Sequence, residues 1–291
     1  MAMMENKILL VNKEENMTSR DVVNKLIPIF KTKKIGHTGT LDPMAKGVLV
    51  VVINEATKLC DLLTSTKKEY IAQIKLGIKT DTKDITGNIE QEQKVRKYSV
   101  DEIKSALNSF LGTSYQEVPK YSAVKINGKK LYEYARNNID IELPNRPLHI
   151  YAIELIEYND NIITFKVEVS KGTYIRSLVE DIAAKLNTIG TMSSLIRTKQ
   201  GDFTIENSYT LDEIKNNNYQ YLTLKEALKN YKQIDINGVE YNKIKNGAII
   251  DKKYQDDIIV FIYNNKVVGI YKTYDKDQTK MKPYKIFNMI Y

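Results

Sequence analysis

The sequence predicts an α+β protein in two parts, a larger mixed part followed by a smaller β-rich part. Segments that alternate polar and apolar residues, typical of half-buried strands, are interspersed with segments that carry helix-capping signals such as Ser99–Glu102. From about Asp235 the chain changes to short strand-like segments separated by turns. We therefore expect one domain over residues 1–233 and a second over residues 234–291.

Periodicity and capping place the elements of the larger part. Strands are expected at Lys7–Val11, Val48–Ile53, Lys68–Gly77, His149–Tyr158 and Ile162–Ser170. The last two are joined by Asn159–Asn161, so we expect them to pair antiparallel. Helices are expected after a cap at Thr18 or Ser19, at Glu55–Leu63, after Ser99, after Arg176, and at Leu211–Lys215 and Leu224–Tyr231.

In the smaller part, strands are expected at Asp257–Tyr263, Lys266–Lys272 and Lys282–Phe287, with a turn at Asn264–Asn265.

Composition limits the classes of function. Among 291 residues, 44 are Lys or Arg and 36 are Asp or Glu, and the net charge of +8 attracts polyanions such as nucleic acid or a membrane surface. No apolar run approaches the ~20 residues of a membrane span, and no signal-peptide pattern begins the chain. We therefore expect a cytoplasmic protein that does not enter a membrane.

The few cysteine and histidine residues argue against metal sites built from them. Cys60 is the single cysteine, which excludes an internal disulfide and a cysteine-rich metal site. Only His37 and His149 are present, so a histidine-rich zinc or iron site is not expected.

A glycine-containing loop leads into the apolar strand Val48–Ile53. Gly36 and Gly39 let the backbone approach a ligand closely, and Pro43 restricts the conformation of Asp42. A carboxylate on such a stiff turn is a candidate nucleophile, but an Asp-Pro pair is also an ordinary turn initiator. The residues alone leave both interpretations open. The glycine spacing fits neither a dinucleotide-binding fingerprint nor a phosphate-binding P-loop.

Basic and aromatic residues are interleaved in Pro119–Arg136, which contains Tyr121, Tyr132, Tyr134, Lys125, Lys129 and Lys130. Positive groups bind phosphates and aromatic faces stack on bases, so this composition suits single-stranded RNA. An amphipathic helix with a solvated basic side is the alternative.

Several segments resemble the TruB family of tRNA pseudouridine synthases. Gly36–Ala45, continued by Gly47-Val-Leu, resembles the catalytic loop of that family. Further similar segments are Thr80–Gly87, Pro119–Arg136, Lys171–Arg176, Ser194–Thr198 and Gly201–Phe203. Three positions depart from the family pattern: Lys46 replaces a small hydroxyl residue, Lys13–Asn16 lacks the usual Pro and Gly, and Ile196 replaces an Arg. The C-terminal part resembles a PUA-type RNA-binding domain through Ile244–Gly247, Val268–Ile270 and Lys282–Phe287.

The resemblance implies the pseudouridine synthase fold, with a mixed, largely antiparallel sheet and a small β-rich PUA-like C-terminal domain. It implies a tRNA pseudouridine-55 synthase that acts on the T-loop without a cofactor or metal. Asp42 would be the nucleophile, paired with Arg176, and Tyr70 would stack on the target base and help to remove its C5 proton. Without the resemblance, Arg176 would be read as an ordinary surface ion pair and Tyr70 as core.

The same resemblance implies the surroundings of the substrate. Tyr174 and Leu195 would line the pocket, and His37 would contact the RNA. Further contacts to the substrate are expected from Gly36, Gly39, Lys125 and Lys130. We expect a monomer whose partner is the T-arm of tRNA. The alternative is a noncatalytic RNA-binding protein that helps tRNA to fold.

Overall fold

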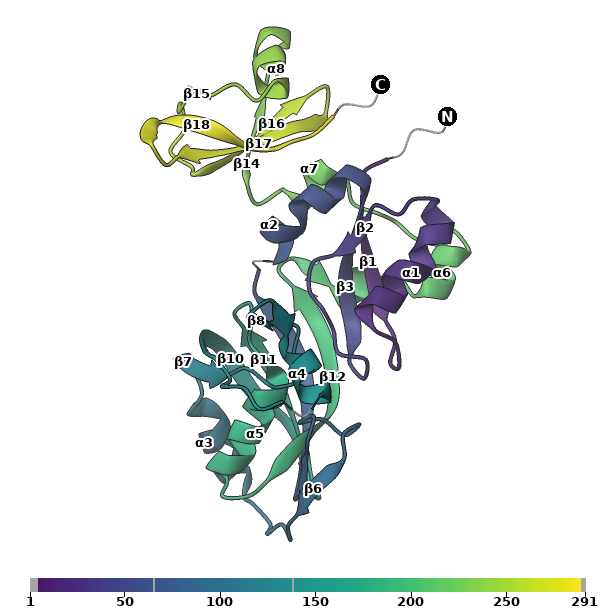
Figure 1. Cartoon of the computed structure of the whole chain (residues 1–291), viewed down its shortest axis with the longest axis vertical. Coiled ribbons are helices and arrows are strands. Elements are labelled where there is room, and N and C mark those ends of the chain that lie inside the picture. The colour runs from purple at the N-terminus through teal and green to yellow at the C-terminus, as the bar shows by residue number, and fades with distance from the viewer. Residues whose placement is uncertain (1–4, 65, 138, 289–291) are drawn as a thin grey trace.

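The computed structural model describes residues 5–64, 66–137 and 139–288, and within them it contains a main sheet of nine strands and a second sheet of five (Figure 1). The core of the main sheet, in spatial order, is β1 (Lys7–Lys13), β3 (Lys46–Ile53), β12 (Gly190–Gln200), β4 (Lys68–Leu76), β11 (Ile162–Val169), β10 (Asn145–Asn159) and β7 (Gly112–Glu117). Two short strands extend it, β2 (Ile35–His37) beside β3 and β13 (Phe203–Thr204) beside β12.

The main sheet is largely antiparallel, as expected. Its neighbouring strands pair antiparallel with one exception, β3 and β12, which run parallel where Lys46 and Gly47 meet Ile196 and Arg197. This short parallel contact lies beside the candidate site. Two small hairpins stand apart from the sheet: β5 (Ile78–Thr80) with β6 (Ile89–Glu92), and β8 (Lys125–Ile126) with β9 (Lys129–Lys130).

Helices cover the main sheet, and two of them begin at caps that the sequence predicted. Thr18 caps α1 (Ser19–Phe30) with Asp21, and Ser99 caps α3 (Val100–Asn108) with Glu102, each through a reciprocal capping box. The helical elements of the larger part are α1 (Ser19–Phe30), the 3₁₀ helix η1 (Asn54–Leu59), α2 (Cys60–Thr64), α3 (Val100–Asn108), α4 (Leu131–Arg136), α5 (Ile175–Lys185), the 3₁₀ helix η2 (Ile205–Asn207), α6 (Leu211–Lys215) and α7 (Leu224–Ala227). The helix expected at Leu224–Tyr231 therefore forms but ends earlier, at Ala227.

The burial of β3 explains why its sequence is continuously apolar. Alternate residues of a strand point to opposite faces of a sheet. Leu49 and Val51 pack into the cluster beneath α1 and α5, whereas Val48 and Val50 pack into a second cluster on the other face. Strand β4 has only one fully covered face, and its residues alternate between buried and half-buried as the sequence predicted.

The C-terminal sheet consists of β14 (Lys232–Asp235), β16 (Ile258–Tyr263), β17 (Lys266–Tyr274), β18 (Asp277–Ile286) and β15 (Ile250–Asp251), in that spatial order. It lies at one end of the molecule beside α2 and α7 (Figure 1). Val260, Ile262 and Phe287 belong to the same apolar cluster as Ile8 and Val48 of the main sheet. The two sheets therefore share a core.

One helix of this part was not expected. Helix α8 (Gly238–Lys245) begins at Asn237, whose side chain accepts hydrogen bonds from the main-chain N–H groups of Val239 and Glu240. Only Tyr241 and Ile244 of the helix are buried, so its sequence has little of the apolar periodicity that predicts a helix. The boundary after residue 233 stays a prediction, and β14 spans that point.

Candidate active site

A cleft of about 420 Å³ lies over the central strands of the main sheet, where β4 and β12 meet the loop that precedes β3. It brings together six of the residues expected at the site from sequence, which are Gly39, Asp42, Tyr70, Tyr174, Arg176 and Leu195. These come from four separate segments, and α5 contributes Arg176 through its first turn.

Asp42 and Arg176 form a bidentate ion pair in this cleft. Arg176 Nε lies 2.9 Å from Asp42 Oδ2, and Arg176 Nη2 donates to Asp42 Oδ1 at 3.2 Å. The guanidinium is almost fully buried, with 6% of Arg176 exposed, whereas the Asp42 side chain keeps 31% of its surface accessible. The planar fork of an arginine fixes a carboxylate in orientation as well as charge. Arg176 therefore fixes the orientation of the Asp42 carboxylate, and the accessible side of that carboxylate faces the cleft.

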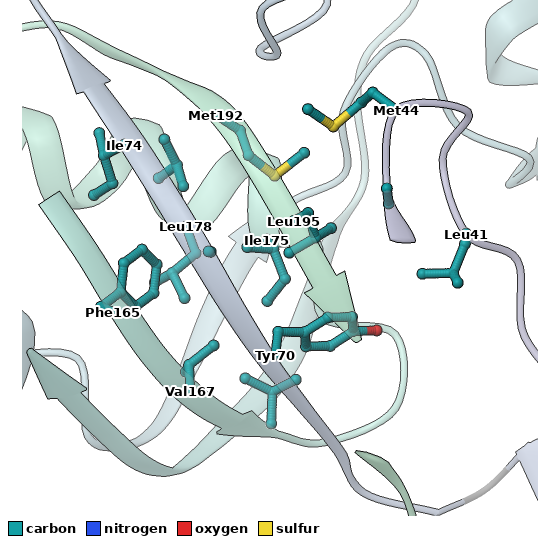
Figure 2. Packing of buried hydrophobic residues seen from close by; sticks show 14 of the residues in the cluster. Leu41, Met44, Tyr70, Ile74, Phe165, Val167, Ile175, Leu178, Met192 and Leu195 are labelled. Carbon is teal, nitrogen blue, oxygen red and sulfur yellow. The ribbon is translucent and has the colours of Figure 1, made fainter. Parts of the chain in front are cut away.

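The loop that carries Asp42 is anchored from several directions. Leu41, Met44 and Ala45 are buried in the main core, and Figure 2 shows the first two extending from the loop. Ala45 N donates to Asp42 O at 3.0 Å, which closes the turn. The fully buried Lys13 donates from Nζ to Pro43 O at 3.2 Å. Asp42 therefore projects from a turn that its neighbours hold in place.

The Thr80–Gly87 segment is the stiff polar turn that its side chains predicted, and it also supports the site. Asp84 Oδ1 accepts hydrogen bonds from Thr86 N and Thr82 Oγ1, each at 3.0 Å. The turn presents the carbonyl of Thr82 to Arg176 Nη1 at 3.1 Å. Arg176 Nη2 also donates to Tyr121 O at 3.0 Å, so the side chain that orients Asp42 is itself fixed.

Tyr70 belongs both to the core and to the cleft. Its ring packs beside Val167, Ile175 and Leu195, while its hydroxyl points out of this cluster towards the segment of Leu41 (Figure 2). Tyr70 is therefore both a core residue and a residue of the candidate site.

Arg197 is a residue of the cleft to which sequence reasoning gave no role. It is 1% exposed, and it donates from Nε to Val48 O at 2.8 Å and from Nη2 to Gly39 O at 3.1 Å. Gly47 makes this close approach of β3 and β12 feasible, since a Cβ there would lie 2.2 Å from Arg197 O. The similarity of Ser194–Thr198 to a family segment was the available signal for it.

Burial shifts the protonation equilibria of the site. It raises the pKa of Asp42 above the ordinary value, and the guanidinium of Arg176 acts in the opposite direction. Burial lowers the pKa of Lys13 to about 8 and that of Lys68, which also lines the cleft, to about 8. Burial likewise lowers the pKa of His37.

Four residues expected at the site do not line the cleft. Gly36 lies in β2, where an added Cβ would face Cys60 Sγ at 3.5 Å. His37 is half-buried at the end of the same strand. Lys125 and Lys130 oppose each other in the β8–β9 hairpin, whose flanking residues line the cleft.

Two other features bear on cofactors and location. In the described part of the chain, no three His, Cys, Asp or Glu side chains converge as a set of metal ligands. None of the helices described has the length and apolar character needed to cross a membrane.

Comparison with known proteins identifies the family. Residues 28–175 match a family model described as TruB family pseudouridylate synthase (N terminal domain), and residues 176–232 match one described as tRNA pseudouridylate synthase B C-terminal domain. The tRNA pseudouridine synthase B of Bacillus pumilus is 42% identical over 304 residues, with 98% of each chain covered. That of Caldicellulosiruptor saccharolyticus is 43% identical, with 95% of this chain and 96% of the relative covered.

Solved structures show the same fold. A chain in a crystal structure of a Cbf5-Nop10-Gar1 complex superposes with a TM-score of 0.72 at 23% identity, covering 99% of this chain and 85% of the other. A chain of an H/ACA RNP bound to a substrate RNA gives a TM-score of 0.72 at 22% identity, covering 97% and 85% of the two chains. Together, sequence and fold define an RNA pseudouridylate synthase, an isomerase of uridine. The chain belongs to the TruB family.

Proposed function

We propose that the protein converts the T-loop uridine of tRNA, at position 55, to pseudouridine with Asp42 as the nucleophile. Relatives named tRNA pseudouridine synthase B, about 40% identical over nearly the whole chain, support tRNA as the substrate. The observation that carries the chemical part is the Asp42–Arg176 pair, an aimed carboxylate open to the cleft. A cytoplasmic monomer is part of the same proposal.

The reaction breaks the N1–C1′ bond of uridine and forms a bond between C5 and C1′. The proton on C5 leaves and N1 gains one, so the product is an isomer and the reaction needs no oxidant or reductant. The detached base must be retained while it turns, either by a transient covalent bond to Asp42 or by the walls of the pocket. The carboxylate attacks either C6 of the ring or C1′ of the sugar, and the second route parallels a retaining glycosidase.

The other residues have supporting roles in this proposal. Tyr70 stacks on the base and takes part in removing the C5 proton, while Tyr174 and Leu195 form the walls around it. Gly39 lets the loop approach the RNA, and Gly36 supports that loop from β2. His37 keeps the uridine out of its stack, a step that costs a few kcal/mol in general. Lys125 and Lys130 bind phosphates from the hairpin beside the cleft, so RNA affinity should fall steeply with salt.

The test is to incubate wild type and Asp42→Asn with unmodified tRNA and to map pseudouridine by carbodiimide-dependent primer-extension stops. We expect a stop at the T-loop uridine with wild type and none with the variant, while both bind tRNA in a filter assay. Wild-type turnover by the variant would remove Asp42 from its role. Tight binding by wild type without any stop would favour the noncatalytic folding function.

A further inference from the structure

Arg197 is a buried cation that the proposed reaction leaves without a role. Its three main-chain acceptors, the carbonyls of Gly39, Thr40 and Val48, are neutral. Among the described residues no carboxylate forms an ion pair with Arg197, and its neighbour across the sheet is Tyr70. A buried guanidinium without an anionic partner is costly to desolvate. Its retention in this cleft therefore requires a reason beyond loop support.

The sheet places Arg197 directly opposite Tyr70. The two residues are register partners on β12 and β4, and both line the cleft. Side chains of directly opposite residues stand on the same face, about 5 Å apart at Cβ. This register puts the Tyr70 oxygen beside the guanidinium, which can only donate hydrogen bonds, so the oxygen is the acceptor in this contact. Arg197 therefore fixes where that oxygen lies, and the rest of the oxygen's surface is left for the cleft.

This geometry has a chemical consequence for the last step of isomerisation. There the C5–H bond breaks and its electron pair re-forms the C5=C6 double bond of the ring, while the proton moves to a base. C6 at the same time releases the Asp42 carboxylate or gives up its double bond to N1, which takes a proton. A phenol oxygen can take a proton from carbon when it passes its own proton to water in the same step. A neighbouring cation stabilises the negative charge that the oxygen develops during this transfer.

We propose that Arg197 is a positioning residue for removal of the C5 proton. It holds the Tyr70 oxygen towards the base and stabilises the negative charge that this oxygen develops as it accepts the C5 proton and passes its own to water. The inference rests on the proposed function and deepens it by separating one step from the others.

The experiment measures single-turnover rates on a T-arm stem-loop RNA whose target uridine carries hydrogen or deuterium at C5. Arg197→Gln should slow isomerisation by about 10- to 100-fold, the worth of one charge-assisted hydrogen bond. The ratio of hydrogen to deuterium rates should rise above that of wild type, because the proton step becomes more rate-limiting. Arg197→Lys keeps the charge and should recover part of both changes.

Gln200→Met is the matched control. Gln200 is a buried neighbour on β12 that supports the same loop, donating from Nε2 to Thr38 Oγ1 at 2.5 Å and to Leu63 O at 3.1 Å. Because it lies opposite Lys68 and not Tyr70, its loss should leave the isotope ratio at the wild-type value.

A slower Arg197→Gln with an unchanged isotope ratio would overturn the inference and leave Arg197 a purely structural residue. If Arg197→Gln does not fold, Arg197→Lys decides, since a raised ratio supports the proposal and an unchanged ratio contradicts it. Absence of pseudouridine with wild-type protein would instead refute the proposed function, because that control does not involve Arg197.

Discussion

Removing the guanidinium of Arg176 tests the electrostatics of the candidate site most directly. In Arg176→Met, Asp42 loses two contacts, at 2.9 and 3.2 Å, and two main-chain carbonyls lose their donor. Breaking a buried pair costs about 3–5 kcal/mol in general, but 31% of the Asp42 side chain can be solvated, so we expect about 2–3 kcal/mol. If the whole of that energy serves to orient the nucleophile in the transition state, its loss should lower the single-turnover rate near pH 7.5 about 30- to 150-fold.

The pH dependence separates loss of charge from loss of alignment. The reaction requires ionised Asp42, so activity is present above its pKa and is lost as the pH falls through it. Burial already raises that pKa, and Arg176 lowers it, so Arg176→Met should raise it further. The acidic limb of the rate profile should therefore move to higher pH in Arg176→Met, and by less in Arg176→Lys.

The assay is single-turnover conversion of T-arm RNA between pH 4.5 and 8.5. The control is Arg96→Met, which removes an exposed pair with Glu102 at 2.7 Å and should leave the profile unchanged. An acidic limb that stays at the wild-type pH in Arg176→Met would refute the idea that Arg176 keeps Asp42 ionised.

Three further predictions concern the loop and its supports. Asp42→Asn should give no detectable pseudouridine yet bind tRNA within a few-fold of wild type; a parallel loss of binding would mean that Asp42 shapes the RNA surface. Gly47→Ala should lower the free energy of unfolding, measured by urea titration, by about 2–4 kcal/mol, because φ is +105° and Arg197 O blocks a Cβ. Gly112→Ala is the control, since Gly112 has φ +95° but no atom within 4 Å of an added Cβ, and it should lower the free energy of unfolding by less. Equal losses in the two variants would contradict the steric argument. Burial lowers the pKa of Lys13 to about 8, so above that pH the unfolded chain binds more protons at this position than the folded chain does. The free energy of unfolding should therefore rise by up to about 3 kcal/mol between pH 8 and 10.4. A Lys13→Met variant that shows the same rise would exclude Lys13 as its source.

Local signals predicted the elements of the fold well where the causes are local. The caps at Thr18 and Ser99 lie three residues from their partners, so the start of each helix was visible in the sequence. Helix α8 was missed because its sequence has a cap but little amphipathic pattern.

The site depends on long-range contacts, and these explain what the sequence could not provide. Arg176 lies 134 residues from Asp42, and Arg197 lies 149 residues from Val48. No periodicity links positions so far apart, so Asp42 and Arg176 were expected together only through the family resemblance. Arg197 was missed because the role proposed for it follows from its place opposite Tyr70, which depends on both the order and the register of the strands.

The apolar cluster shared by the two sheets makes the chain one cooperative unit. Ile8 and Val48 on one side and Val260 and Ile262 on the other lose the same contacts if either sheet melts. Calorimetry should therefore record a single transition, although the sequence changes character near residue 235. Cutting the chain there would expose buried surface on both pieces, so substitutions on the outer face of the C-terminal sheet, and not truncations, should be used to test whether this sheet binds RNA.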